Sequence, residues 1–135
     1  MEPLTSLKTT DAVHVAIPAR AEFVHVLRSV TGAVAGHLPL TLDDIDDLRL
    51  AVDEACERLL SLPGTPRTIR LELRTMSGRV EAILAVDATA IWPPGGFEDT
   101  LSWRILGALG DHVQFELWNG APAIRIAKRT LGGVR

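Results

Sequence analysis

The chain has a single cysteine, a small net charge and no long hydrophobic run. Cys56 alone cannot form a disulfide within the chain, and a lone thiol fits a reducing compartment. No apolar stretch approaches the roughly 18 residues of a membrane-spanning helix, and residues 1–10 lack the apolar segment of a signal peptide. The net charge of −3 reveals no basic excess for nucleic acid. We therefore expect a cytoplasmic protein that binds neither membranes nor nucleic acid directly.

The chain does contain enough apolar residues for one globular domain. Hydrophobic residues make up 47% of it and charged residues 23%, as in ordinary folded proteins. We expect residues 1–10 to be frayed, residues 11–130 to form a single domain and residues 131–135 to be a loose tail.

Hydrophobic periodicity predicts the order strand, helix, helix, strand, strand, helix, strand, strand. The strands are expected at 12–17, 68–75, 80–86, 112–118 and 122–128, and the helices at 19–36, 42–60 and 101–109. Asn119-Gly120 is a strong hairpin signal between the last two strands. Hairpin-linked strands with helices between them favour an α+β fold, in which a mostly antiparallel sheet has its helices on one face.

The second predicted helix, which Thr41 can cap, carries two stripes of residues. Apolar residues at steps of three and four predict a face packed on the core, namely Ile45, Leu48, Val52, Ala55 and Leu59. A second stripe lies outside that face and consists of Asp47, Ala51, Glu54 and Arg58. Because Glu54 and Arg58 are four residues apart, they have the spacing of an ion pair on a helix.

Residues 48–60, LRLAVDEACERLL, resemble the N box of the GHKL (Bergerat-fold) ATPases, and specifically of the RsbW-like anti-sigma factors and serine kinases. In that family a Glu on this helix activates the attacking group, and an Asn four residues later ligates Mg²⁺. Glu54 matches the Glu, but Arg58 stands at the Asn position. A guanidinium has donors and no acceptor, so Arg58 cannot ligate a metal. The resemblance implies the GHKL fold with a damaged catalytic site.

The resemblance extends from about Val13 to Lys128, and the other nucleotide-binding motifs also depart from the family pattern. Asp87 matches the Asp that binds adenine, but Thr89 and Ile91 replace the two glycines that follow it. β-branched residues fit poorly where a backbone must approach a ligand. Residues 100–103, TLSW, stand where a Gly-x-Gly should bind phosphates, and the loop before them has no basic residue. We expect Glu54, Asp87 and Arg58 to be vestiges of a nucleotide site without a resident cofactor.

The Arg at the Asn position and the Ser-Trp at the third helix are similar to degenerate anti-sigma factors of mycobacterial sigma-F type. The resemblance implies a homodimeric anti-sigma factor that sequesters an alternative sigma factor and is released by a STAS-domain anti-anti-sigma protein. The alternative is an active serine kinase that phosphorylates this antagonist with Mg-ATP, with Glu54 as base and Asp87 on the adenine. A third hypothesis is a sensor domain whose emptied pocket accepts another small molecule.

Several residues have two interpretations. Glu54 is either a residual base or a helix carboxylate paired with Arg58, and Asp87 either binds adenine or caps a strand end. In the family, basic residues at the start of the first helix contact the partners. The residues there are Arg20, His25 and Arg28, which are candidate partner contacts or simply solvated side chains.

The remaining notable residues favour structural roles. The four histidines lie on unrelated elements without metal-ligand spacing, so no metal site is expected. Trp92, Trp103 and Cys56 are expected in the core. The acidic run at 43–47 is expected to complement the helix dipole and face solvent, with a partner patch as the alternative.

Overall fold

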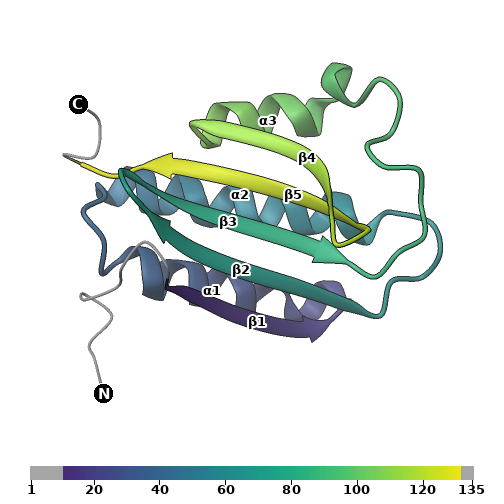
Figure 1. Ribbon diagram of the computed structural model, residues 1–135, viewed down its shortest axis with the longest axis horizontal. Helices are drawn as coiled ribbons and strands as arrows, with labels where there is room; N and C mark the ends of the chain where they lie inside the picture. Colours follow the sequence, from purple (N-terminus) through teal and green to yellow (C-terminus); the bar gives the residue numbers. More distant parts are fainter. Residues whose placement is uncertain (1–10, 132–135) are drawn as a thin grey trace.

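The computed structural model describes residues 11–131, in which an antiparallel sheet has its helices on one face (Figure 1). The predictions for residues 1–10 and for 132–135 of the tail lie outside the described residues. Leu131, the first residue of the expected tail, donates its backbone N–H to the carbonyl of Pro39 at 2.6 Å. The α+β fold class predicted from the sequence is confirmed.

The sheet has five strands in the order β1-β2-β3-β5-β4. Its strands are β1 (Ala12–Pro18), β2 (Thr68–Met76), β3 (Arg79–Val86), β4 (His112–Trp118) and β5 (Ala121–Arg129). The helices are α1 (Val24–Ala35), α2 (Leu42–Leu60) and α3 (Leu101–Leu109), with short 3-10 turns η2 (Ala21–Phe23) and η3 (Phe97–Asp99). The predicted order and most boundaries are confirmed, including the β4–β5 turn at Asn119 and Gly120, which both have positive φ.

The start of α1 differs from the prediction by several residues: the helix begins at Val24 and not at Ala19. Pro18 ends β1, and the backbone N–H of Ala19 still donates to the carbonyl of Arg67 at 2.9 Å. This bond keeps the chain beside the sheet, and Arg20 is extended with φ of −133°. The helical geometry therefore starts only after the 3-10 turn η2.

α2 forms as the sequence predicts, and it packs along the helix-covered face of the sheet (Figure 1). Thr41 caps it by accepting a hydrogen bond from the N–H of Asp44 at 3.0 Å. Ile45 is half-buried, and the other core positions are fully buried: Leu48, Val52, Ala55 and Leu59. Ala51 was expected outside the core face, but it is also fully buried, because α3 packs against that side of α2.

Alternate residues of β2, Ile69, Leu71 and Leu73, are buried toward the helices. Glu72 lies on the outer face of the sheet, yet it is only 5% exposed. Its carboxylate accepts a hydrogen bond from Arg74 and lies 3.2 Å from the ring of His14. Arg74 on the same strand and His14 on β1 therefore lie against this carboxylate.

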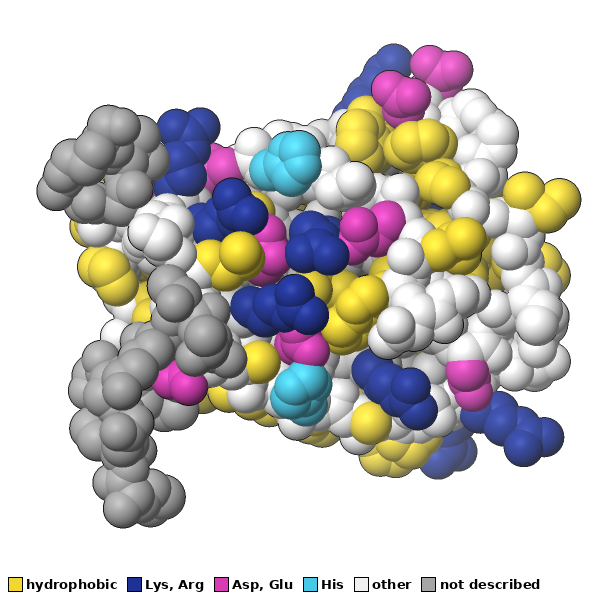
Figure 2. Space-filling view, viewed as in Figure 1, with side chains coloured by type: hydrophobic (Ala, Val, Ile, Leu, Met, Phe, Trp, Pro, Cys, Tyr) yellow, Lys and Arg dark blue, Asp and Glu magenta, His cyan; other side chains and the backbone are white. Residues whose placement is uncertain are grey.

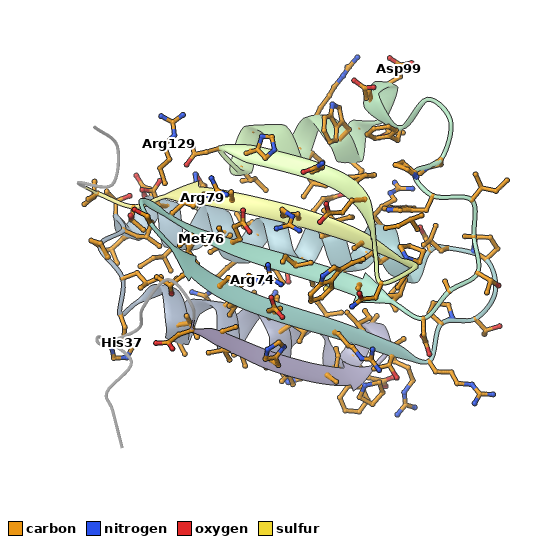
Figure 3. The ribbon with its side chains drawn as sticks, in the orientation of Figure 1. His37, Arg74, Met76, Arg79, Asp99 and Arg129 are labelled. Atoms are coloured by element: carbon orange, nitrogen blue, oxygen red, sulfur yellow. The ribbon has the colours of Figure 1, made fainter. Side chains whose placement is uncertain are left out.

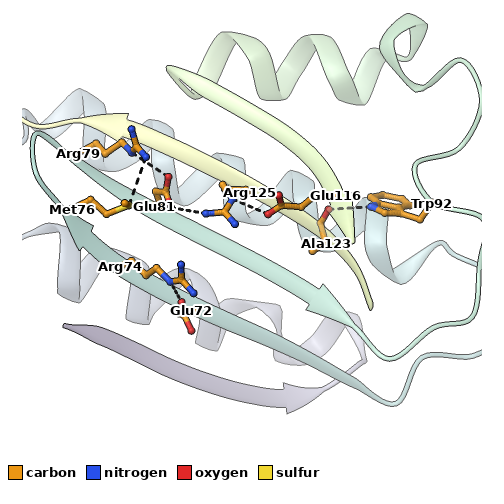
Figure 4. Close-up of polar contacts among 9 residues, drawn as sticks. All are labelled: Glu72, Arg74, Met76, Arg79, Glu81, Trp92, Glu116, Ala123 and Arg125. Atoms are coloured by element: carbon orange, nitrogen blue, oxygen red, sulfur yellow. Dashed lines mark hydrogen bonds and ion pairs between the residues drawn. The ribbon is translucent and has the colours of Figure 1, made fainter. Parts of the chain in front are cut away.

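A second buried carboxylate on the outer face, Glu81, joins three strands (Figure 4). It accepts hydrogen bonds from Arg79 at 3.1 Å and from Arg125 at 2.8 Å, and Arg125 also donates to Glu116 at 2.7 Å. Figure 2 shows basic and acidic side chains intermingled across this face, and Figure 3 shows Arg74, Met76 and Arg79 on it. The charged side chains of this network thus pair with one another on the outer face of the sheet.

Lys128 links the end of β5 to the start of α2. Its Nζ lies 3.5 Å from a carboxylate oxygen of Asp44 and 3.5 Å from one of Asp47, and its side chain is 7% exposed. The acidic run at 43–47 was expected to face solvent and complement the helix dipole. Two of its carboxylates instead hold a buried ammonium, and the dipole position in the first turn is retained.

Candidate functional site

Glu54, predicted to belong to a vestigial nucleotide site, lies where α2 meets α3. Glu54 of α2 accepts a hydrogen bond from the hydroxyl of Ser102 in the first turn of α3, with 2.7 Å between Oγ and Oε2. Ser102 is buried, with 3% of its surface exposed. Residue types and spacing do not predict this contact. The family resemblance indicates only that Ser102 stands in the segment where the family binds phosphates.

The ion pair expected between Glu54 and Arg58 is not formed, so that prediction is wrong. The carboxylate of Glu54 is directed to Ser102 instead, because α3 brings a hydroxyl within hydrogen-bond distance. Arg58 keeps its place one turn later on α2, and its Nε is buried without a hydrogen-bond partner in the part of the chain that the structure describes. Arg58 cannot act as a metal ligand beside Glu54, since its guanidinium only donates hydrogen bonds and has no acceptor atom.

Asp87 lies directly after β3 and holds the start of β2. Its Oδ1 accepts hydrogen bonds from the backbone N–H groups of Arg67 at 2.8 Å and Thr68 at 3.0 Å. The hydrogen bond from Thr68 lowers the pKa of Asp87, and the bond from Arg67 lowers it further against the opposing effect of burial. Asp87 therefore caps a strand end, which is one of its two interpretations, and its contact with adenine stays a prediction.

We expect the stabilising effect of Asp87 to disappear in acid. A carboxylate with a lowered folded pKa stabilises the protein above its unfolded value of about 3.9 and loses this effect as pH falls through the folded pKa. Asp87→Ala should therefore be less stable than the wild type at neutral pH, and the difference should shrink below about pH 4. Urea denaturation across this pH range measures it. Asp99→Ala, at an exposed carboxylate in η3 (Figure 3), is the control and should give no such convergence.

The segment between Asp87 and α3 is anchored by aromatic rings. Trp92 stacks on Phe115 with 5.0 Å between ring centroids, and its Nε1 donates to the carbonyl of Ala123 at 3.1 Å (Figure 4). Phe97 stacks on the same Phe115 at 5.0 Å, and Trp103 meets both phenylalanine rings edge-on. The core position expected for Trp92 is confirmed, whereas Trp103 is only half-buried.

A groove runs between the start of α1 and the end of α2, with a volume of about 590 Å³. At its base Arg28 of α1 donates to Asp53 of α2 at 2.8 Å. Of the three predicted partner contacts, the structure brings His25 and Arg28 together in this groove. Arg20 does not line it, and its guanidinium lies 5.1 Å from the ring of Phe23. The groove lining is Ala21, Val24, His25, Arg28, Asp53, Glu57, Leu60 and Ser61.

Sequence reasoning missed Asp53 and Glu57 as groove residues. The available signal was their spacing of four on α2, on the side away from the apolar stripe. Arg28 and Asp53 are 25 residues apart, so only the packing of α1 on α2 makes them a pair.

Cys56 is fully buried within α2. Burial raises the pKa of the Cys56 thiol to about 12, and the nearby charge of Asp53 adds to this shift. No group of three or more His, Cys, Asp or Glu side chains within residues 11–131 is arranged to hold a metal ion. None of the helices in those residues is both long and apolar enough to cross a membrane.

Sequence comparison connects this site to proteins of known name. No family model matches the chain. The chain is 39% identical over 105 residues to the anti-sigma-F factor RsbW of Mycobacterium tuberculosis, a match covering 76% of this chain and 60% of that protein. The serine-protein kinase RsbW of Halalkalibacterium halodurans is 38% identical over 50 residues, which are 37% of this chain and 31% of the kinase. The chain thus spans less than two thirds of the length of these relatives.

Structural comparison gives the fold. A crystal structure of the RsbU and RsbW domains of a Mycobacterium tuberculosis protein matches 89% of this chain and 32% of its own, with a TM-score of 0.63 and 15% identity. At this identity the structural match establishes the fold alone. The chain is therefore RsbW-like in sequence and has the GHKL fold.

Proposed function

We propose that the chain is an anti-sigma factor that binds an alternative sigma factor directly and is released by a STAS-domain anti-anti-sigma protein. The main support is the similarity to an anti-sigma-F factor over 76% of the chain, combined with the departures from the family's nucleotide-binding motifs. In this proposal the protein sequesters its partner by binding alone, and no phosphate is transferred.

The geometry of the vestigial site supports a function without a kinase step. The Glu54 carboxylate is occupied by Ser102, which is buried at the opening of α3. At position 58 the guanidinium of Arg58 stands where the family has a metal-binding amide, and it has no acceptor atom that could ligate a metal. The loop at 88–100 offers no lysine or arginine to neutralise phosphates. Each of these features opposes Mg-ATP binding for a separate physical reason.

The groove between α1 and α2 is the proposed partner surface. Its apolar walls include Val24 and Leu60, and its charged base is the Arg28–Asp53 pair. Such a combination suits a partner helix, because apolar side chains supply buried area while the charges select the partner. His25 is exposed at the groove, and Arg20 at the nearby start of α1 extends the proposed contact.

We also propose that the protein is a homodimer, as the family resemblance implies. Light scattering of the purified chain would report twice the 14.6 kDa chain mass if the proposal is correct. A mass that remains at one chain over the concentration range of the binding assay would reject it.

The alternative function is a serine kinase that phosphorylates the antagonist. Retention of Glu54 and Asp87, the two carboxylates of the family motifs, is the observation in its favour. Transfer of the γ-phosphate from ATP to a serine of the STAS partner would establish this alternative.

Binding of the host's alternative sigma factors, measured by calorimetry with and without Mg-ATP, tests the proposal. We expect tight binding to one sigma factor with a Kd that Mg-ATP changes by less than about twofold. Arg28→Glu should weaken it at least about tenfold, since it removes the Asp53 pair and places three carboxylates at the groove. Arg104→Glu, an exposed charge reversal on α3, is the matched control. Binding that requires Mg-ATP, or no binding to any sigma factor, would contradict the proposal.

A further inference from the structure

We infer that Glu54 and Ser102 are positioning residues, which close the vestigial site from within the chain and hold α3 on α2 without a nucleotide. This inference deepens the proposed function and rests on it for its biological meaning, because a site closed by the chain itself makes partner binding independent of ATP. It assigns Glu54 the role of a hydrogen-bond acceptor and gives its basicity no role.

The position of the hydroxyl is determined by the cap of α3. Thr100 accepts a hydrogen bond from the N–H of Trp103 at 3.2 Å and donates its own hydroxyl to the carbonyl of Phe97 at 2.6 Å. These two bonds preset the first turn of α3, which turns Ser102 toward α2. With 3% exposure, Ser102 is shielded from water and needs a partner inside the protein.

Glu54 provides this partner at 2.7 Å, a normal distance for a hydroxyl bonded to a carboxylate. The acceptor comes from a residue 48 positions earlier in the chain. Loss of either side chain would leave the other polar group without its partner at the α2–α3 contact. The bond therefore ties α3 to α2 at the point where relatives are expected to hold phosphates.

The preceding segment is fastened independently, on the side of the sheet. Trp92 and Phe97 both stack on Phe115 of β4, and Trp92 also binds the carbonyl of Ala123 on β5. The loop at 88–100 is thus fixed to the sheet at one end, and Ser102 fixes the start of α3 to α2 at the other. Together these contacts hold the loop against the sheet and the first turn of α3 against α2.

Amide hydrogen exchange of residues 100–109 in the full chain distinguishes an acceptor from a base. Glu54→Gln retains an acceptor oxygen but cannot act as a base, so exchange should match the wild type. Glu54→Ala and Ser102→Ala should each exchange about tenfold faster in α3, because each removes the hydrogen bond between the half-buried Glu54 and the buried Ser102. Asp46→Ala, at an exposed residue on the same helix, is the matched control and should not differ from the wild type.

Rescue by the conservative variant is the decisive comparison. Fast exchange in Glu54→Gln would overturn the inference, and so would wild-type exchange in both alanine variants. Slower wild-type exchange on adding millimolar Mg-ATP would overturn it too, because it would show that a nucleotide still completes the site. If the exchange results are as expected but no sigma factor binds the wild type, the closure is supported and the proposed function fails.

Discussion

Replacing Trp92 by alanine should lower the free energy of unfolding by about 3–5 kcal/mol. The side chain is 6% exposed, stacks on Phe115 and donates to the carbonyl of Ala123. Its removal creates a cavity next to Phe115 and leaves a buried carbonyl without its donor, so two costs act together. Urea denaturation followed by circular dichroism measures the change.

Ile91 is the matched control for this substitution. It precedes Trp92 in the same loop, but its side chain is 90% exposed. Ile91→Ala should change the free energy of unfolding by less than about 0.5 kcal/mol. A loss for Trp92→Ala no greater than that for Ile91→Ala would show that the aromatic cluster does not anchor the loop.

Replacing Glu81 by alanine should cost about 1.5–3 kcal/mol, a smaller but still large effect. Glu81 is 3% exposed and accepts hydrogen bonds from Arg79 on its own strand and from Arg125 on β5. Its loss leaves two guanidinium groups close together without the carboxylate between them. Because Arg79 is partly exposed, water can solvate its guanidinium in the variant and offset part of this cost. We therefore expect the loss of stability not to exceed about 3 kcal/mol.

Two further variants separate the charge of Glu81 from its position. Glu81→Gln keeps one acceptor oxygen and should lose less stability than Glu81→Ala. Glu98→Ala removes an exposed carboxylate from η3 and should have little effect. Equal stability of Glu81→Ala and Glu98→Ala in urea would refute a stabilising role for the network on the outer face.

If the protein binds the sigma factor without a kinase step, release of the sigma factor follows mass action. An antagonist that competes for the same surface shifts the free fraction according to its concentration and its dissociation constant. In the proposed scheme Mg-ATP does not enter this balance, because Glu54 and Ser102 occupy each other. Control would then act on the amount or state of the antagonist.

Local sequence signals predicted the secondary structure well because they describe short-range physics. Thr41 caps α2 through a bond to Asp44, three residues away, and the Asn119-Gly120 pair supplies the positive φ values of the last hairpin. The start of α1 was predicted too early, because the bond from Ala19 to Arg67 joins residues 48 positions apart. Periodicity carries no information about such a bond.

The contacts of the predicted site residues followed from the sequence only in part. The segment around Glu54 and Arg58 pointed to the GHKL fold, which the structure confirms. The spacing of four predicted that these two side chains pair, and the structure shows that Ser102 takes the carboxylate instead. A local rule ranks only the partners within one helix, whereas α3 brings in a donor that the rule does not include.

The sequence by itself determined the helices and strands, the apolar faces that they bury, and the lack of a metal-ligating atom at Arg58. Each of these depends on residue type and short spacing. Only the tertiary structure decided which polar groups meet. Glu54 with Ser102, Arg28 with Asp53 and Lys128 with Asp47 join residues 48, 25 and 81 positions apart. Their contacts exist because the helices pack on the sheet in one arrangement, which brings side chains far apart in the sequence within hydrogen-bond distance.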